Sequence, residues 1–320
     1  MRKNSKLANQ SRLWRNITKA VITDAGFASR FLPWTKTNPK AMLPLGNMPI
    51  MQHVINECVE AGISEIIIVT TKEGKVIYDD YFENAVNHVR KQLRDSGKLQ
   101  RYESVQEVLD FPKIRVIIQD PALPYGNGSP IYTAKQYIGD DEPFVVCYSD
   151  DLLLNTSDVK TMIETFHRYS EVDAIIMGQE IPDSQVDKYG MIKLLDDQSP
   201  AMLDCIVEKP SIGNQPSNLA SYGRYLLTPR IFDYLKPNKT GKDGELWTVD
   251  AITELAKFGQ VMVATTKGKW VTTGDPANYA IAQINYILEH EDYADEVFKA
   301  VVTHSSARQR SARLTEADFS

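Results

Sequence analysis

Lys19-Ala-Val-Ile-Thr-Asp-Ala-Gly-Phe-Ala-Ser-Arg30 is the stretch around which the rest of the chain is organised. Residues 20–22 form a short apolar run that ends at a turn signal, and this pattern predicts a buried strand. The chain then enters a loop of small residues at Gly26, where exposed N–H groups suit phosphate oxygens. Arg30 and Lys40 add two cations to a segment that prolines stiffen. A strand that leads into such a loop predicts a binding site for a triphosphate.

Two well-known phosphate-binding loops differ from this one. The dinucleotide fingerprint is excluded because its second and third glycines are absent, and a Walker A loop is excluded because no Gly-Lys-Ser/Thr follows. An ordinary strand-to-loop turn with solvated charges explains these residues equally well when they are taken alone.

The composition favours a globular enzyme or binding protein over other classes. At 320 residues the chain is long enough for one large α/β domain or two small ones, and its 42% hydrophobic and 24% charged residues are ordinary values. The net charge of −6 argues against nucleic acid as the main partner, and no apolar run is long enough to span a membrane. Three well-separated cysteines in apolar contexts predict reduced core residues of a cytoplasmic protein.

Alternating strand and helix patterns predict an α/β fold. Residues 65–70 and 113–119 are apolar runs typical of parallel strands, and residues 49–61 carry apolar side chains on one helical face. This strand–helix–strand order predicts a right-handed crossover.

The two ends of the chain differ from its middle. Residues 1–17 carry basic residues and no acid, which predicts a flexible N-terminal arm, or an arm that docks on a neighbouring subunit. We expect residues 18–303 to form a single domain and residues 304–320 to form a disordered C-terminal tail. An amphipathic helix near residues 292–302 could pack on a partner.

Two acids follow the apolar run at residues 144–148. Asp150 and Asp151 would lie at the carboxyl end of a buried strand, where open α/β sheets bind ligands. Hard oxygen ligands at that place suit Mg²⁺, which keeps waters and phosphate oxygens in its shell. A helix N-cap together with a surface acid is the alternative, and strand placement alone leaves both open.

Three later segments could contact a substrate. Gly126 and Gly128 stand close to a predicted helix start and would admit a base or ribose edge, or simply form a tight loop. Gly190 permits close approach to a sugar ring. Glu208 can accept from sugar hydroxyls and Lys209 can bind a phosphate, although an exposed ion pair at a strand end is the alternative.

The order and spacing of these segments resemble the sugar-nucleotide pyrophosphorylases, and within them the bacterial UTP–glucose-1-phosphate uridylyltransferases. The family pattern is G-x-G-T-R-x-L-P-x-T-K-x-x-P-K-E-M-L-P. The positions that match it are Gly26, Arg30, Leu32, Pro33, Thr35, Lys36, Pro39, Lys40, Met42, Leu43 and Pro44. The later Tyr189-Gly190 and Glu208-Lys209-Pro210 segments resemble the sugar-site segments of the family.

The resemblance implies a Rossmann-like, mixed and mostly parallel central sheet flanked by helices. It implies transfer of a uridylyl group from UTP to glucose 1-phosphate, with UDP-glucose and pyrophosphate as products. The residues that it implies for catalysis are Arg30, Lys40 and Lys209. The residues that it implies for the nucleotide are Ala25, Gly26, Gln119, Gly128 and Asp150, and Asp150 would also bind Mg²⁺. The residues that it implies for the sugar are Tyr189, Gly190 and Glu208. Many relatives form dimers or tetramers, so a homo-oligomer is expected.

The chain departs from the family pattern at three places. Thr272 stands where the family has a second magnesium aspartate, so magnesium affinity should drop unless Asp151 or Asp275 compensates. Ala28 replaces a glycine and Ala41 a glutamate, which leaves the base preference open. Besides a UDP-glucose-forming enzyme, the sequence therefore permits a sister enzyme with another base or sugar phosphate, or a catalytically weak regulatory subunit that binds sugar nucleotides.

Overall fold

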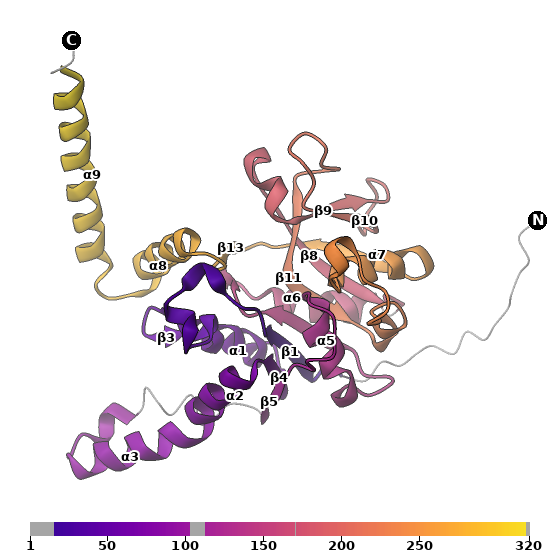
Figure 1. The fold of residues 1–320 in the computed structure, drawn as a ribbon, viewed down its shortest axis with the longest axis horizontal. Helices are drawn as coiled ribbons and strands as arrows, with labels where there is room; N and C mark the ends of the chain where they lie inside the picture. The colour runs from indigo at the N-terminus through magenta and orange to yellow at the C-terminus, as the bar shows by residue number, and fades with distance from the viewer. Residues whose placement is uncertain (1–15, 103–112, 170, 318–320) are drawn as a thin grey trace, which may run out of the picture.

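The computed structural model describes residues 16–102, 113–169 and 171–317. Its body is a central β-sheet with helices on both faces, and two helices, α3 (Ala85–Asp95) and α9 (Ala294–Ala317), extend from one side of it (Figure 1). The expected α/β fold is therefore confirmed.

The strand predicted from the opening stretch, β1 (Lys19–Asp24), lies inside the sheet. It pairs in parallel with β4 (Glu65–Thr70) on one side and with β6 (Phe144–Tyr148) on the other, and β5 (Lys113–Ile118) lies beyond β4. Because parallel strands present their carboxyl ends at one edge, the residues after β1 and β6 meet there.

The rest of the sheet makes it mixed. Strand β11 (Leu219–Leu227) is antiparallel to β6, to β8 (Ala174–Glu180) and to β9 (Gly190–Leu194). β10 (Leu203–Glu208) is antiparallel to β9, and β12 (Val261–Thr265) is parallel to β8. Within the described residues, β10 and β11 thus run against the remaining strands of a mostly parallel sheet, as expected.

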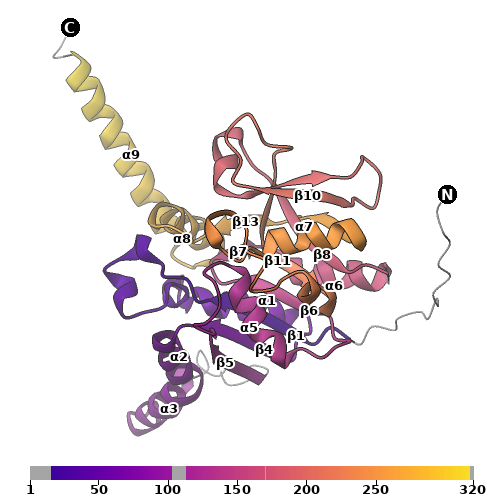
Figure 2. The same ribbon diagram turned by 45° about the vertical axis from the view of Figure 1, so that its right-hand side comes forward.

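Helices cover the two faces because the buried strands are apolar on both sides. Ala20 and Ile22 face a cluster that includes α1 (Ile50–Glu60) and α6 (Asp158–Arg168). Val21 faces the opposite cluster, which includes α5 (Gly128–Ala134) and α7 (Thr248–Phe258). Figure 2 shows α5 and α7 on their side of the sheet.

Shorter elements complete the molecule. A two-stranded unit joins β7 (Asp151–Leu154) to β13 (Lys269–Thr272), and a second joins β2 (Pro44–Leu45) to β3 (Met48–Pro49). The remaining α-helices in the described residues are α2 (Lys72–Asp79) and α8 (Pro276–His290), and short 3-10 and π-helical segments lie between the larger elements. Cys58 and Cys147 are buried and Cys205 is half-buried, and all three are free thiols. No helix in the described ranges combines the length and apolarity needed to cross a lipid bilayer.

The chain ends only partly follow the expectation. Residues 1–15 of the predicted arm lie outside the described residues, and Ile17 at its end is buried. The predicted disordered tail is wrong for residues 304–317, because α9 continues through Ala317. The sequence of this segment has few apolar residues, but it contains three Ala and three Arg residues, and both residue types have a high helix propensity. The limits of the single domain stay a prediction.

Candidate active site

A cavity of about 410 Å³ opens at the carboxyl ends of β1 and β6. It gathers side chains from the loops after both strands and from segments more than a hundred residues away in sequence. The predicted site residues among its lining are Ala25, Gly26, Lys40, Gln119, Asp150 and Lys209.

Lys40 and Asp150, which both line this cavity, form an ion pair. The Lys40 Nζ donates to Asp150 Oδ2 at 2.5 Å. Burial alone would raise the pKa of Asp150, but the charge and hydrogen bond of Lys40 outweigh it and lower that pKa. The pKa of Lys40 is raised in turn, because attraction to Asp150 exceeds the effect of its burial. The charged pair therefore persists across the physiological pH range.

Asp24, the last residue of β1, is a second carboxylate in the cavity that the sequence analysis did not select. It accepts hydrogen bonds from Tyr78 Oη and, at 2.7 Å, from Ser149 Oγ. Burial raises its pKa to about 6, although both hydrogen bonds oppose the shift. The rule that selected Asp150, an acid at the carboxyl end of a buried strand, applies equally to Asp24.

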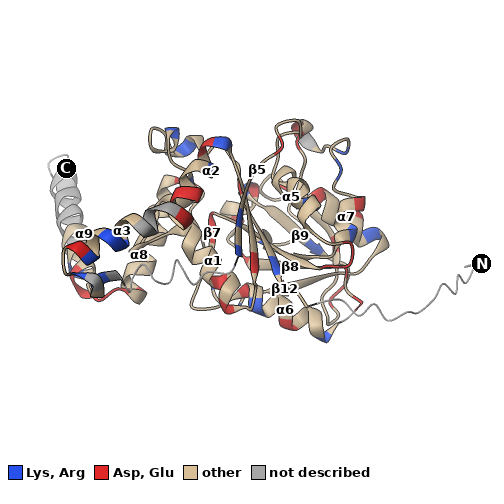
Figure 3. Cartoon of the chain, turned by 90° about the horizontal axis from the view of Figure 1, so that it is seen from below, with Lys and Arg blue, Asp and Glu red and all other residues tan. Residues whose placement is uncertain are grey.

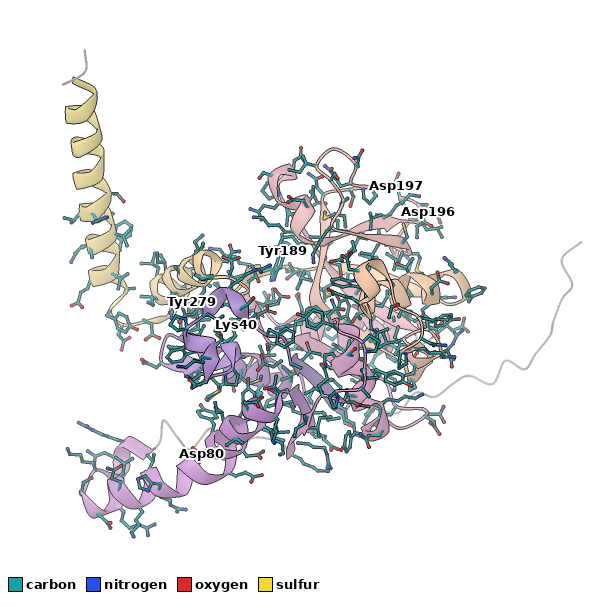
Figure 4. All side chains as sticks on the ribbon, in the orientation of Figure 1. Lys40, Asp80, Tyr189, Asp196, Asp197 and Tyr279 are labelled. Carbon is teal, nitrogen blue, oxygen red and sulfur yellow. The ribbon has the colours of Figure 1, made fainter. Side chains whose placement is uncertain are left out.

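The loop after β1 carries its own backbone constraint. Ala28 has a left-handed conformation, with φ of 46°, at a position where Gly is the favoured residue. The Thr35 hydroxyl donates to the Ala28 carbonyl at 2.9 Å, and Tyr279 of α8 supports the same segment by donating to the Pro44 carbonyl at 2.6 Å. Figure 4 labels Tyr279 and Lys40. Arg30 is exposed and is not part of the cavity lining.

The glycines before α5 have different roles. Gly126 lines the cavity with φ of +134°, and a Cβ there would lie 2.4 Å from the Leu246 carbonyl oxygen. Gly128 lies at the start of α5, where its N–H donates to the Leu246 carbonyl at 2.8 Å and a Cβ would lie 2.7 Å from Leu235. Close packing, rather than a cavity wall, therefore accounts for Gly128. Gln119 also lines the cavity.

The predicted sugar residues gather beside Lys209. Gly190 and Glu208 are paired across β9 and β10, and a Cβ on Gly190 would lie 3.0 Å from Glu208 Oε2. Lys209 follows with φ of 45°, and its Nζ lies 3.5 Å from Glu208 Oε1. Tyr189 turns instead toward Trp270, with ring centroids 5.0 Å apart, and lines a neighbouring cavity. Burial raises the pKa of Glu208, although Lys209 opposes the shift.

Comparison with known proteins agrees with this arrangement. A family model described as nucleotidyl transferase matches residues 19–289. This chain belongs to the nucleotidyl transferase family. It is 37% identical over 289 residues to UTP–glucose-1-phosphate uridylyltransferase 2 of Staphylococcus saprophyticus, covering 90% of this chain and 98% of that protein. It is 33% identical to the UTP–glucose-1-phosphate uridylyltransferase of Bacillus subtilis, covering 88% and 95%.

Solved structures of the family superimpose over most of the chain. The UTP-bound UGPase from Acinetobacter baumannii has a TM-score of 0.79 and 30% identity, covering 89% of this chain and 99% of that one. A UDP-glucose pyrophosphorylase complexed with UDP-glucose has a TM-score of 0.74 and 32% identity, covering 86% and 100%. The family resemblance seen in the sequence is confirmed.

In this nucleotidyl transferase, the two carboxylates that could replace the missing aspartate near Thr272 both have other hydrogen-bond partners. Asp151 accepts from Trp270 Nε1 at 2.8 Å and from the Gly223 N–H at 3.1 Å. Both oxygens of Asp275 cap the start of α8 through hydrogen bonds from residues 277 and 278. Within the described residues, no group of three or more His, Cys, Asp or Glu side chains forms a metal-binding cluster. Both proposed substitutes therefore already accept hydrogen bonds at each of their carboxylate oxygens.

The lining of this family member's cavity includes further residues that the sequence analysis did not select. Among them are Tyr148, Glu245 and Trp247. Trp247 precedes α7, and its ring faces the Lys209 ammonium at 4.9 Å from the ring centroid. An aromatic residue at a helix start is usually a packing residue, so its position in the sequence gave no signal of this contact.

Proposed function

We propose that this chain transfers the uridylyl group of UTP to glucose 1-phosphate and releases UDP-glucose and pyrophosphate. The observation that carries the proposal is the one cavity that holds Lys40 and Asp150 together with Lys209 and the backbone at Gly126. It offers charge for a triphosphate, an open edge for a base, and a separate cation for a sugar phosphate. The substrates named for the relatives are the ones that this combination suits.

The chemistry requires alignment more than acid–base catalysis. An anionic phosphate oxygen of glucose 1-phosphate attacks the α-phosphorus of UTP, a new P–O bond forms, and the bond to the β-phosphate breaks to release pyrophosphate. Lys40, with Arg30 from the loop, would hold the β- and γ-phosphates. Lys209 would orient the sugar phosphate. Removing one of these cations should cost on the order of a few kcal/mol in the transition state.

Asp150 fits the binding of Mg²⁺. Its carboxylate is partly open to the cavity and shares the site with Lys40, and no full protein cage surrounds it in the described residues. Mg²⁺ is usually bound through one or two carboxylates together with substrate phosphates, so this donor set is sufficient once UTP is present. A bound Mg²⁺ would neutralise charge on the α-phosphoryl group.

The base and sugar would occupy opposite sides of the cavity. Ala25 and Gly26 would leave room for the nucleotide, and Gln119 with Gly126 would contact the base edge. Gly190 and Glu208 would hold the sugar ring and its hydroxyls beside Lys209. A sister activity with another base or sugar phosphate is the alternative, since Ala28 and Ala41 differ from the family pattern.

We further propose that the protein is cytoplasmic and associates with copies of itself. Self-association is supported by the exposed apolar side chains on α8 and α9, which a second copy of the chain could cover. They lie at the side of the molecule from which α9 extends (Figure 1). Figure 3 shows acidic and basic residues interspersed over the body in that view, which does not suit a nucleic-acid partner.

A substrate panel tests the reaction. The protein is mixed with Mg²⁺, each nucleoside triphosphate and several sugar 1-phosphates, and pyrophosphate release is followed. Turnover with UTP and glucose 1-phosphate alone supports the proposal, and turnover only with another pair supports a sister enzyme. Release no greater than that of an Asp150→Ala control, with nucleotide binding retained, would instead indicate a regulatory subunit.

A further inference from the structure

Lys209 has an unusual backbone and a loosely held side chain. Its φ of 45° is left-handed, a conformation that costs a non-glycine residue about 1–3 kcal/mol and is found most often at functional sites. Its N–H donates to the Tyr189 carbonyl at 3.1 Å, which fixes the backbone. The side chain is about half exposed, and the Glu208 carboxylate at 3.5 Å is too distant for a short hydrogen bond. A flexible four-carbon chain of this kind needs a second contact to keep one orientation.

Trp247 supplies that contact. The Lys209 ammonium lies 4.9 Å from the centroid of the indole ring, within the range of a cation–π interaction. Both residues line the same cavity. Trp is the strongest cation–π partner among the aromatic side chains, and its face attracts an ammonium without neutralising its charge. A carboxylate at the same place would compete with the incoming phosphate for the ammonium, whereas an aromatic ring does not.

The segment that carries Trp247 is itself fixed against the nucleotide side of the cavity. The Leu246 N–H donates to the Tyr125 carbonyl at 2.8 Å, and the Leu246 carbonyl accepts from the Gly128 N–H at 2.8 Å. The Thr248 N–H donates to Asn127 Oδ1, also at 2.8 Å. Hydrogen bonds of the residues before and after Trp247 therefore fix the backbone that holds the indole ring against Lys209.

We propose that Trp247 is a positioning residue. Its indole ring holds the Lys209 ammonium at a place in the cavity where the ammonium can bind the phosphate of a sugar phosphate. This inference rests on the proposed function, because it concerns the step in which Lys209 meets the sugar phosphate. It predicts that changes at Trp247 alter the KM for glucose 1-phosphate and leave the KM for UTP unchanged.

The first experiment compares Trp247→Phe with Trp247→Leu. Phe keeps a weaker aromatic face, whereas Leu removes it. We expect the KM for glucose 1-phosphate to rise about two- to fivefold in Trp247→Leu and less in Trp247→Phe. Phe258→Leu, an exposed aromatic at the other end of α7, is the matched control and should leave both KM values unchanged. Equal KM values for glucose 1-phosphate in wild type and Trp247→Leu would overturn the inference.

The second experiment separates ring electronics from packing. Fluorinated tryptophans at position 247 keep the size of the ring but weaken the negative charge of its face. The KM for glucose 1-phosphate should rise with each added fluorine, and a flat series would overturn the proposal even if Trp247→Leu does not fold. In a Lys209→Met background, Trp247→Leu should have no further effect on UDP-glucose affinity measured by calorimetry, and a full additional loss would contradict the inference. Turnover of UTP and glucose 1-phosphate by the unmodified chain judges the proposed function separately.

Discussion

At the scale of single residues, Ala28 has the backbone of a glycine. This left-handed conformation costs an L-residue about 1–2 kcal/mol, and Ala28→Gly would relieve that cost. Glycine also has more conformational entropy in the unfolded state, and this opposing effect cancels about half of the gain in stability. We therefore expect Ala28→Gly to raise the free energy of unfolding by about 0.5–1 kcal/mol, measured by urea denaturation. Gly26→Ala in the same loop is the control, since φ there is not positive and a Cβ meets no atom within 4 Å. A less stable Ala28→Gly protein would refute the strain argument.

Thr272 lies close to Asp150, at the position where the family has a second magnesium aspartate. Its hydroxyl accepts from the Gly274 N–H at 3.3 Å, and Asp150 Oδ2 lies near the same glycine. A carboxylate at position 272 would add a hard oxygen ligand where Asp151 and Asp275 are already engaged. We expect Thr272→Asp to lower the magnesium concentration for half-maximal activity several-fold. Thr272→Asn, which introduces a side chain of the same shape as Asp but without its charge, should change it little. An unchanged titration in Thr272→Asp would show that the loop is aligned wrongly.

At the scale of elements, one buried ion pair joins α1, α6 and β11. Glu57 Oε2 accepts from two nitrogens of the fully buried Arg224 at 2.8 and 3.0 Å, and Glu57 Oε1 accepts from the N–H groups of Asp158 and Val159. Arg224 also donates to the Asp151 carbonyl at 2.7 Å, next to the metal-binding position. Removing one partner leaves a charge buried, so Glu57→Leu should cost about 3–5 kcal/mol of unfolding free energy.

The matched double variant tests the origin of that cost. Replacing both partners, as in Glu57→Leu with Arg224→Met, removes both charges and should be clearly less destabilising than the sum of the single changes. Urea denaturation of all four proteins gives the coupling. Additive losses would mean that the two side chains stabilise the fold independently.

Helix α1 also carries a group that makes stability depend on pH. His53 bonds to the Leu45 carbonyl at 2.8 Å, yet burial lowers its pKa below the ordinary value. Because the folded state disfavours the protonated ring, its contribution is present above about pH 6.5 and is lost as the pH falls below that value. Wild type should therefore lose more stability than His53→Gln between pH 7.5 and 5, measured by urea denaturation. His167, exposed on α6, supplies the control substitution, and equal losses in wild type and His53→Gln would contradict this prediction.

At the scale of the whole molecule, the sequence predicted what local patterns determine. Apolar runs predicted β1, β4 and β5 with the helix between β1 and β4, because strands that pack against helices carry continuous apolar sequence, even at β5, which lies at the edge of the sheet and is only half-buried. Contacts between distant segments could not be predicted in this way. Gly128 packs on Leu246, which is 118 residues away, and Arg30 lies outside the cavity because of how the loop folds, which motif spacing does not specify.

Helix α9 packs against α8 at its start and then extends away from the body (Figure 1). Its exposed Phe298, Val301 and Val302 extend the apolar surface of α8, whereas an isolated helix gains little stability in water. We expect a second copy of the chain to cover this surface. Deleting residues 292–320 should lower the mass measured by analytical ultracentrifugation without changing the melting temperature of the body by more than a few degrees. Phe298→Ser with Val302→Ser should have the same effect in the full-length chain. A monomeric full-length protein, or an unchanged mass after deletion, would contradict this assignment.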